Sequence, residues 1–311
     1  MSRLFDGFSR AKSQQTQSET VLPNMTPPDF VPPESAETAE WPGNGMPRGN
    51  GSRGSAEPRQ VYEAEKTRSV MVQPRPISRL VAWSAPNSLG AEKFRALAVR
   101  LDHMRKQHEL SSLQVTSSVI NEGKTFVAAN LAVTLAKYSG AKTLLIEGDL
   151  HRPMLASMFG LKELKLPGLS DWWVGREQDI ARNLVRFNGS DLWFLPAGTV
   201  CDRPSEILRS AQLAEAFAQL AGRFDWIVVD STPMLPVIDA NLWSRLVDGT
   251  LLVVREGVAP LKALKSGLQS LDHPKLIGVV VNEASEFDQI DYEGQYYGAR
   301  KYGDNGSKKA Q

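Results

Sequence analysis

The segment from Ser117 to Thr125, with the sequence SSVINEGKT, contains the residue types that bind a phosphate chain. The usual phosphate-binding loop has a glycine, four variable residues and then Gly-Lys-Ser or Gly-Lys-Thr. The lysine ammonium reaches the β- and γ-phosphates, the hydroxyl binds magnesium, and the second glycine lets the backbone approach the phosphates without a Cβ. Here a serine takes the first glycine position, and the rest of the pattern is present. The residues of this loop that we predict to bind a nucleotide are Ser118, Asn121, Glu122, Gly123, Lys124 and Thr125.

Three carboxylates follow apolar stretches and could complete such a site. Asp230 ends the run Trp-Ile-Val-Val-Asp, where a nucleotidase holds a carboxylate directed at magnesium. Glu147 and Asp149 end the run Thr-Leu-Leu-Ile-Glu-Gly-Asp, and two positions apart on an extended chain they face the same side. Two acids facing one site suggest magnesium ligation and a base for an incoming hydroxyl group. The predicted catalytic residues are Lys124, Glu147, Asp149 and Asp230, and the predicted metal ligands are Thr125, Asp149 and Asp230.

The elements around these residues decide whether the loop pattern has meaning, because a phosphate loop must follow a strand and open a helix. Short β-branched runs alternate with amphipathic stretches, which is typical of βαβ units and a parallel sheet. Strands are expected at 113–118, 143–149, 192–198, 225–231, 249–257 and 275–283, and helices at 89–106, 124–139, 205–221, 238–246 and 260–271. The loop lies between a strand and a helix, so the sequence predicts an α/β fold with a doubly wound, mostly parallel sheet and helices on both faces.

Composition divides the chain into three parts. Residues 1–75 hold nine of the 19 prolines and no lasting apolar period, so we expect a disordered extension. Within it, Leu4, Phe5 and Phe8 fall on one helical face of residues 2–12 that a partner or a membrane surface could use. The α/β domain should span 76–285, and 286–311 should form a flexible tail containing tyrosines.

Charge and cysteine content narrow the class of protein. Lys and Arg total 36 and Asp and Glu 35, so the chain lacks the basic excess of a protein that tracks nucleic acid. A single cysteine, Cys201, fits a reducing compartment and excludes a cysteine-rich metal site. No run of about 18 apolar residues and no apolar core of a signal peptide occurs, so we expect a cytoplasmic protein.

Together these segments resemble the bacterial tyrosine kinases (BY-kinases) of capsule and exopolysaccharide assembly, a branch of the P-loop ATPases. The resemblance covers about residues 77–285. It rests on the GEGKT-like loop, LLIEGDLHRP, FDWIVVDSTPMLPVIDA, ANLAVTLAKYSGAKTLLI, GLSDWWVG, FLPAG, PSEIL, DGTLLVVREG and GVVVNEA.

The resemblance implies ATP and magnesium as cofactors and autophosphorylation of C-terminal tyrosines, in trans within a ring-shaped homo-oligomer. It implies that Glu147 or Asp149 acts as the base and that Asn282 contacts the nucleotide base. It also implies a membrane-anchored chain-length regulator of the polysaccharide as activating partner, which would recruit the kinase to the inner face of the membrane. The phosphoacceptors would be Tyr292, Tyr296, Tyr297 and Tyr302.

The sequence departs from the family pattern at several positions. Glu147 replaces the first aspartate of the pair, and His151 replaces the arginine that follows the pair, with Arg152 retained beside it. The segment after Asp230 has Ser-Thr-Pro in place of Thr-Pro-Pro. The oligomerisation motif Glu-x-x-Arg-x-x-Arg ends in alanine at position 98.

Two alternatives to an active kinase stay open on the sequence alone. One is a nucleotide-binding regulatory scaffold of the export machinery that transfers little phosphate. The other is a partitioning ATPase of the Par/Min type. The latter is disfavoured because no lysine occurs in Val119–Glu122, where that class carries a second, signature lysine.

Overall fold

The computed structural model describes residues 68–71, 79–175, 179–199, 201–235, 238–270 and 275–284, all of which belong to the compact unit Val61–Gln311. Its centre is an eight-stranded sheet in the order β1-β4-β5-β3-β6-β2-β7-β8. The strands are β1 (Arg68–Val70), β2 (Ser112–Ser117), β3 (Thr143–Glu147), β4 (Val185–Phe187), β5 (Leu192–Leu195), β6 (Trp226–Asp230), β7 (Gly249–Arg255) and β8 (Leu276–Asn282).

The pairing confirms the predicted α/β fold. Neighbouring strands from β5 through β3, β6, β2 and β7 to β8 are all parallel, and within the described residues only β4 and β5 pair antiparallel. Strand β6 lies between β2 and β3, so the carboxyl ends of these three strands meet at one edge of the sheet. Asp230 pairs in register with Glu147 on one side and with Val115 on the other.

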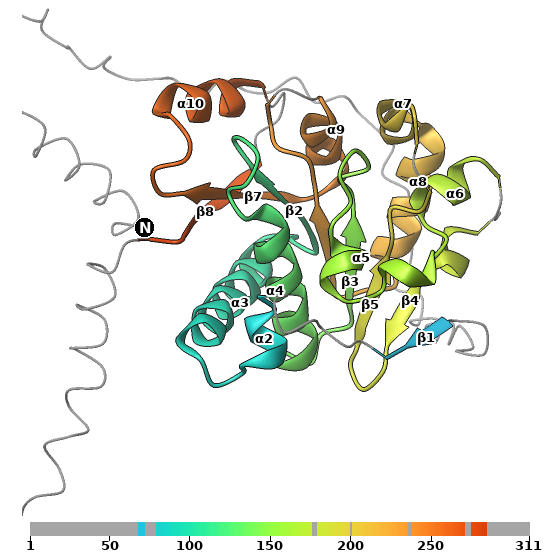
Figure 1. Cartoon of the computed structure of the whole chain (residues 1–311), viewed down its shortest axis with the longest axis horizontal. Coiled ribbons are helices and arrows are strands. Elements are labelled where there is room, and N and C mark those ends of the chain that lie inside the picture. The colour runs from blue at the N-terminus through green and yellow to red at the C-terminus, as the bar shows by residue number, and fades with distance from the viewer. Residues whose placement is uncertain are drawn as a thin grey trace, which may run out of the picture. The chain divides into compact units, whose positions relative to one another are not determined.

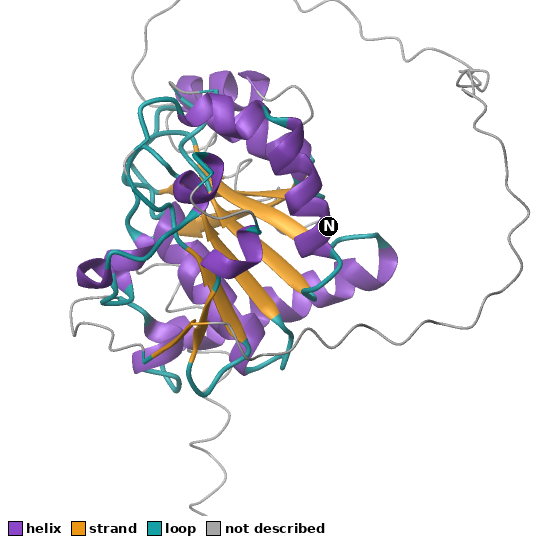
Figure 2. Cartoon of the chain, turned by 90° about the vertical axis from the view of Figure 1, so that its right-hand side faces the viewer, coloured by secondary structure: helices purple, strands orange, loops and turns teal. Residues whose placement is uncertain are grey.

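Helices cover both faces of the sheet (Figures 1 and 2). They are α2 (Val81–Ser84), α3 (Leu89–Gln107), α4 (Lys124–Lys137), α5 (Leu155–Met158), α6 (Leu169–Trp173), α7 (Pro204–Arg209), α8 (Ala211–Ala221), α9 (Asp239–Leu246) and α10 (Leu261–Ser270). Successive strand residues point to opposite faces. In β3, Leu145 joins the apolar cluster under α3 and α4, whereas Leu144 and Ile146 join the cluster under α7, α8 and α9.

Helix α4 explains how the loop is held against the sheet. All ten residues from Val127 to Ala136 are buried, because α4 packs on the sheet and is covered by α3. Asn130 is fully buried within this helix. Its amide accepts a hydrogen bond from the Ala82 N–H (3.0 Å) and donates to the carbonyls of Phe126 (2.9 Å) and Arg79 (3.2 Å). The asparagine thereby fastens the segment before α2 beside the first turn of α4.

Two expectations about elements were wrong in part. The extension 1–75 was expected to lack structure, yet Arg68–Val70 forms β1 and pairs in parallel with β4, because Val70 can be buried at this edge. The single helix expected over 205–221 is two helices, because Ser210 takes an extended backbone and its hydroxyl accepts a hydrogen bond from the Leu213 N–H (3.1 Å), which begins α8. The rest of the extension, including residues 2–12, lies outside the described residues, as does the tail from residue 285.

No helix in the described part of the chain combines the length and the hydropathy that crossing a bilayer requires.

Candidate nucleotide and phosphoryl-transfer site

The loop between β2 and α4 has the backbone of a phosphate cradle. Asn121 (φ 65°) and Gly123 (φ 97°) both lie in the left-handed region. A Cβ on Gly123 would stand 2.1 Å from the side-chain nitrogen of Asn282, so a larger residue would be strained at this φ and would have to displace the Asn282 amide. Ser118 does not have a positive φ, which explains in physical terms why serine fits where the common pattern has glycine.

Neighbouring side chains hold the loop in place. The Glu122 carboxylate, fully buried, accepts hydrogen bonds from the N–H groups of Val119 (2.9 Å) and Arg255 (3.3 Å). The amide of Asn282 donates to the Glu122 carbonyl (2.9 Å). The structure thus places Glu122 and Asn282 as braces of the loop, and Asn282 also lines the adjacent cavity.

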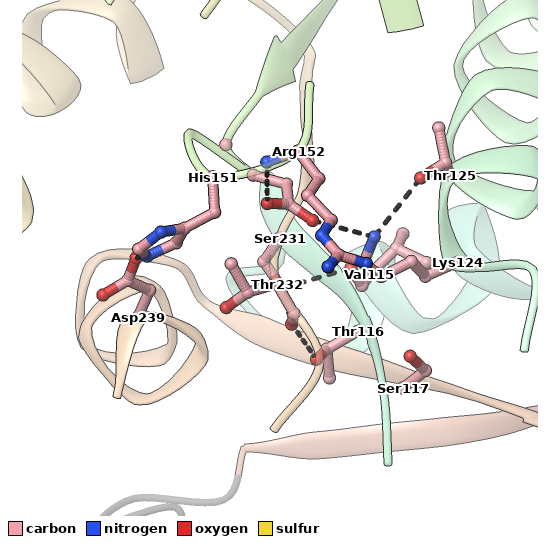
Figure 3. A network of polar contacts seen from close by, with 12 residues as sticks. Val115, Thr116, Ser117, Lys124, Thr125, His151, Arg152, Ser231, Thr232 and Asp239 are labelled. Atoms are coloured by element: carbon pink, nitrogen blue, oxygen red, sulfur yellow. Dashed lines mark hydrogen bonds and ion pairs between the residues drawn. The ribbon is translucent and has the colours of Figure 1, made fainter. Parts of the chain in front are cut away.

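Lys124 and Thr125 open helix α4 and face the third strand. The Lys124 ammonium forms an ion pair with Asp149 (Nζ to Oδ2, 3.0 Å) and lies 3.4 Å from the Thr125 hydroxyl, as Figure 3 shows for the latter pair. The other oxygen of Asp149 accepts a hydrogen bond from the Arg152 N–H (2.9 Å). The predicted lysine, threonine and second carboxylate are therefore brought together at the start of α4.

Asp230 lies at the tip of β6, beside this group, and is 1% exposed. The pKa of its carboxyl is raised to about 7, chiefly by burial and in part by the charges of Asp149 and Glu147, while the charge of Lys124 and a hydrogen bond from Thr125 oppose the rise. Its Oδ1 atom has no hydrogen-bond partner among the described residues. A buried carboxylate oxygen without a partner costs free energy, and a cation at this point would remove that cost.

Glu147 differs from its expected position. It was predicted to face the same site as Asp149, but both of its oxygens accept hydrogen bonds, from the N–H groups of Ala156 (3.2 Å) and Ala197 (3.1 Å), whereas one oxygen of Asp230 has no partner among the described residues. Strand β3 ends at Glu147, so Asp149 lies beyond its alternation, and a Cβ on the intervening Gly148 would stand 2.7 Å from Val229 and 2.9 Å from Trp243. Burial raises the pKa of the Glu147 carboxyl, an effect that these two hydrogen bonds oppose.

A cavity of about 1030 Å³ opens in front of these groups. Among the described residues, its lining carries four permanent cations, Arg79, Lys124, Arg152 and Arg255, and two carboxylates, Asp149 and Glu283. Such an excess of positive charge fits a polyphosphate anion. The other lining residues are Ile120, Asn121, Gly123, Thr125, Phe126, His151, Met154, Met158, Thr232, Pro233, Leu235 and Asn282.

A buried carboxylate that the sequence did not single out fixes one wall of the cavity. Asp239, at the start of α9 and fully buried, contacts the His151 ring (Oδ2 to Nε2, 3.0 Å) and accepts a hydrogen bond from the Ser205 hydroxyl (2.8 Å). Figure 3 shows His151 and Asp239 on the side of the site opposite Thr125. This contact joins the turn after β3 to α7 and α9.

Sequence reasoning also missed the cations Arg79 and Arg255 and the carboxylate Glu283. Arg255 and Glu283 follow apolar runs that were recognised as strands. They therefore lie at the edge where the carboxyl ends of the strands meet, and this position could have identified them as candidate site residues. Ser205 and Asp239 stand in the segments PSEIL and VIDA, which were noted only for their resemblance. For Arg79 the sequence holds no signal. The four candidate phosphoacceptors, Tyr292, Tyr296, Tyr297 and Tyr302, lie outside the described residues.

The donors present fit magnesium with a nucleotide better than a metal held by protein alone. Among the described residues no group of three or more His, Cys, Asp or Glu side chains could hold a metal ion. Magnesium bound with a nucleotide needs only one or two protein oxygens, since phosphates and water supply the rest. The Thr125 hydroxyl and the unpartnered oxygen of Asp230 are such donors.

Comparison with known proteins gives consistent results. The chain is 33% identical over 237 residues to the succinoglycan biosynthesis transport protein ExoP of Rhizobium meliloti, a match that covers 73% of this chain and 29% of ExoP. It is 31% identical to the putative tyrosine-protein kinase CapB of Staphylococcus aureus, covering 71% of this chain and 94% of CapB. The solved chimerical protein CapA2B2 superimposes with a TM-score of 0.61 at 27% identity, covering 69% of this chain and 94% of that one. No model of a protein family matches the chain.

Proposed function

This chain belongs to the family of bacterial tyrosine-protein kinases of capsule and exopolysaccharide synthesis, and we propose that it transfers the γ-phosphate of ATP to tyrosines of its own C-terminal segment. The observation that carries the proposal is the ion pair of Lys124 with Asp149, beside Thr125 and the unpartnered oxygen of Asp230. Lys124, Thr125 and Asp149 line a cationic cavity large enough for a nucleotide, and Asp230 lies next to Thr125 without lining it.

The chain's own groups would bind and orient the phosphates. The N–H groups of the loop and the first turn of α4 point at an anion, and Lys124 neutralises charge on the β- and γ-phosphates. Thr125 and Asp230 would hold magnesium, with Asp149 close enough to contribute a further oxygen. Bound there, the metal supplies neutralisation of charge that develops on the phosphate oxygens.

Asp149 is the carboxylate in place to accept the proton of the attacking phenol. When Lys124 turns from Asp149 to the phosphates, the carboxylate loses its ion pair and can accept a hydrogen bond from a tyrosine hydroxyl entering the cavity. A phenol has a pKa of about 10, so its attack needs such a base. The phenol oxygen forms the new bond to the γ-phosphorus as the bond to the β-γ bridging oxygen breaks, and ADP leaves. We assign Glu147 the separate task of holding the turns at Ala156 and Ala197.

The setting of this reaction belongs to the same proposal. ExoP is a succinoglycan biosynthesis transport protein, and we propose that this chain acts in a comparable polysaccharide export system. A membrane-anchored chain-length regulator would recruit and activate it at the inner face of the membrane, through residues 1–75 or the helical face of residues 2–12. Phosphorylation in trans would take place in a homo-oligomer through the helix that carries Glu92 and Arg95.

The test is transfer of labelled phosphate from ATP to the purified chain, with and without the cytoplasmic segment of its membrane regulator. We expect label on Tyr292, Tyr296, Tyr297 or Tyr302, its loss in Lys124→Met, and a fall of about 100-fold or more in Asp149→Asn.

Glu147→Gln should retain far more transfer than Asp149→Asn. Lys162→Met, on a short helical turn away from the cavity, is the matched control. ATP binding without label on any of these tyrosines, even with the regulator present, would refute the kinase in favour of a regulatory scaffold.

A further inference from the structure

One wall of the cavity carries a carboxylate clamped between two arginines. Glu283 forms an ion pair with Arg79 (Oε1 to Nη1, 3.2 Å) through one oxygen and with Arg255 through the other. All three residues line the cavity. Two guanidinium groups that converge on one carboxylate form the arrangement that proteins use to bind phosphate oxygens.

The clamp is built from backbone that is under strain on both sides. Arg79 (φ 37°) and Glu283 (φ 52°) both have a positive φ, which residues other than glycine adopt rarely and at a cost. Each is held by a defined anchor. The carbonyl of Arg79 accepts a hydrogen bond from the buried Asn130, and Glu283 directly follows Asn282, whose amide donates to the loop. The backbone positions of both residues thus rest on hydrogen bonds outside the ion pair.

Arg255 connects the clamp to the phosphate loop. Its guanidinium lies 3.5 Å from the carbonyl of Asn121 (Nη1 to O), and its backbone N–H donates to Glu122. The side chain is about one-third exposed, so it can turn toward a ligand in the cavity. An anion on the loop would therefore compete with Glu283 for this guanidinium.

We propose that Arg79 and Arg255 form an anion subsite for the phosphate chain of the bound nucleotide, which Glu283 occupies in the nucleotide-free protein. The proposal rests on the proposed function in that it takes ATP as the ligand of the cavity. When the triphosphate enters, Glu283 is displaced and the arginines bind phosphate oxygens in its place. The carboxylate thus competes with the nucleotide and lowers the apparent affinity.

The test is the equilibrium affinity of the full chain for MgATP, MgADP and adenosine, measured by calorimetry. In Glu283→Gln the internal competitor is removed, and we expect MgATP to bind about three- to tenfold more tightly, with a smaller gain for MgADP and none for adenosine. Arg255→Gln should weaken MgATP binding, and Glu283→Gln should no longer tighten binding in that background. Asp191→Asn, which removes an exposed carboxylate from an ion pair of similar length with Arg186, should change nothing.

The direction in which Glu283→Gln changes the MgATP affinity distinguishes a competing carboxylate from one that only supports the structure. If Glu283 only stabilised the cavity wall, Glu283→Gln would weaken binding or leave it unchanged, and either result overturns the proposal. An equal gain for adenosine would also overturn it, because adenosine has no phosphate. The readout is binding, so a chain that shows the expected affinities but labels no tyrosine refutes the kinase and leaves the subsite in place. A chain that binds no MgATP refutes both.

Discussion

Asp230 shows how a single residue can serve function at the expense of stability. Its carboxylate is buried, one oxygen has no partner among the described residues, and the pKa is raised to about 7. Above that pH the nucleotide-free protein therefore holds a poorly solvated charge near two other carboxylates. The same negative charge that destabilises the free protein can bind a cation when the nucleotide binds.

Asp230→Asn should therefore change stability and binding in opposite directions. At pH 8, without magnesium, we expect the variant to be more stable than the wild type by about 1–3 kcal/mol, because a buried charge is removed. Urea unfolding measures this difference, with Asp202→Asn, an exposed position, as control. Calorimetry should show that the variant has lost the magnesium-dependent part of its ATP affinity. Lower stability with unchanged magnesium dependence would contradict the role assigned to this residue.

Individual residues also show how far the sequence could predict the site. The presence of carboxylates at the ends of β3 and β6 was predictable, because an apolar run that ends in an acidic residue is visible in the sequence. The separation of Glu147 from Asp149 was not, because it depends on backbone N–H groups of Ala156 and Ala197 that reach Glu147 only in the folded chain. A period of two along a strand says nothing about side chains beyond the strand's last residue.

At the scale of elements, one aspartate links the starts of two neighbouring strands, β2 and β7. The Asp248 carboxylate accepts hydrogen bonds at 2.8–3.0 Å from the N–H and hydroxyl groups of Ser111 and Ser112, before and at the start of β2, while β7 begins one residue later. Burial alone would raise the pKa of this carboxyl, but the hydrogen bonds outweigh it and the pKa lies below its ordinary value.

A depressed pKa fixes the sign of the pH dependence. The stabilisation by Asp248 is present above the unfolded pKa of about 3.9 and is lost as the pH falls through the lower, folded value. Asp248→Asn should thus cost about 1 kcal/mol at pH 7, a modest figure because the group is exposed, and progressively less below pH 4. Urea unfolding at several pH values checks this. A deficit that is the same at pH 3 and pH 7 would show that the charge contributes nothing.

Long, periodic elements were predictable and short ones were not. All six expected strands and the long helices are present, because each carries enough apolar residues to show its period. Strands β1 and β4 have three residues each, and α2 and α5 four, too few for any period. The break at Ser210 was hidden because apolar residues continue from α7 (Ile207 and Leu208) into α8 (Leu213, Phe217 and Leu220).

At the scale of the whole molecule, strand β1 brings a segment from before the first helix to the edge of the sheet beyond β4. Three register pairs and the hydrogen bond from the Asn188 N–H to the Val70 carbonyl (3.0 Å) hold it there. Val70 is buried in the main apolar cluster. The boundary of the folded domain thus includes residues that composition had assigned to the extension.

Two truncations should differ by the contribution of this strand. A chain starting at residue 66 keeps β1 and should retain its stability, whereas one starting at residue 73 lacks it and should be less stable by about 1–3 kcal/mol. Thermal or urea unfolding compares the two, and MgATP binding should be the same in both, since β1 does not line the cavity. Equal stability would mean that the edge pairing contributes nothing.

The contact of His151 with Asp239 predicts how substitutions at these two positions are correlated among members of the family. The family pattern has arginine at position 151. Arginine and histidine can both donate an N–H hydrogen bond to the buried carboxylate. An apolar residue there would leave the Asp239 carboxylate with the Ser205 hydroxyl as its side-chain partner among the described residues. Positions 151 and 239 are therefore expected to change together along a lineage, so that a relative without a donor at the first should also have lost the acid at the second.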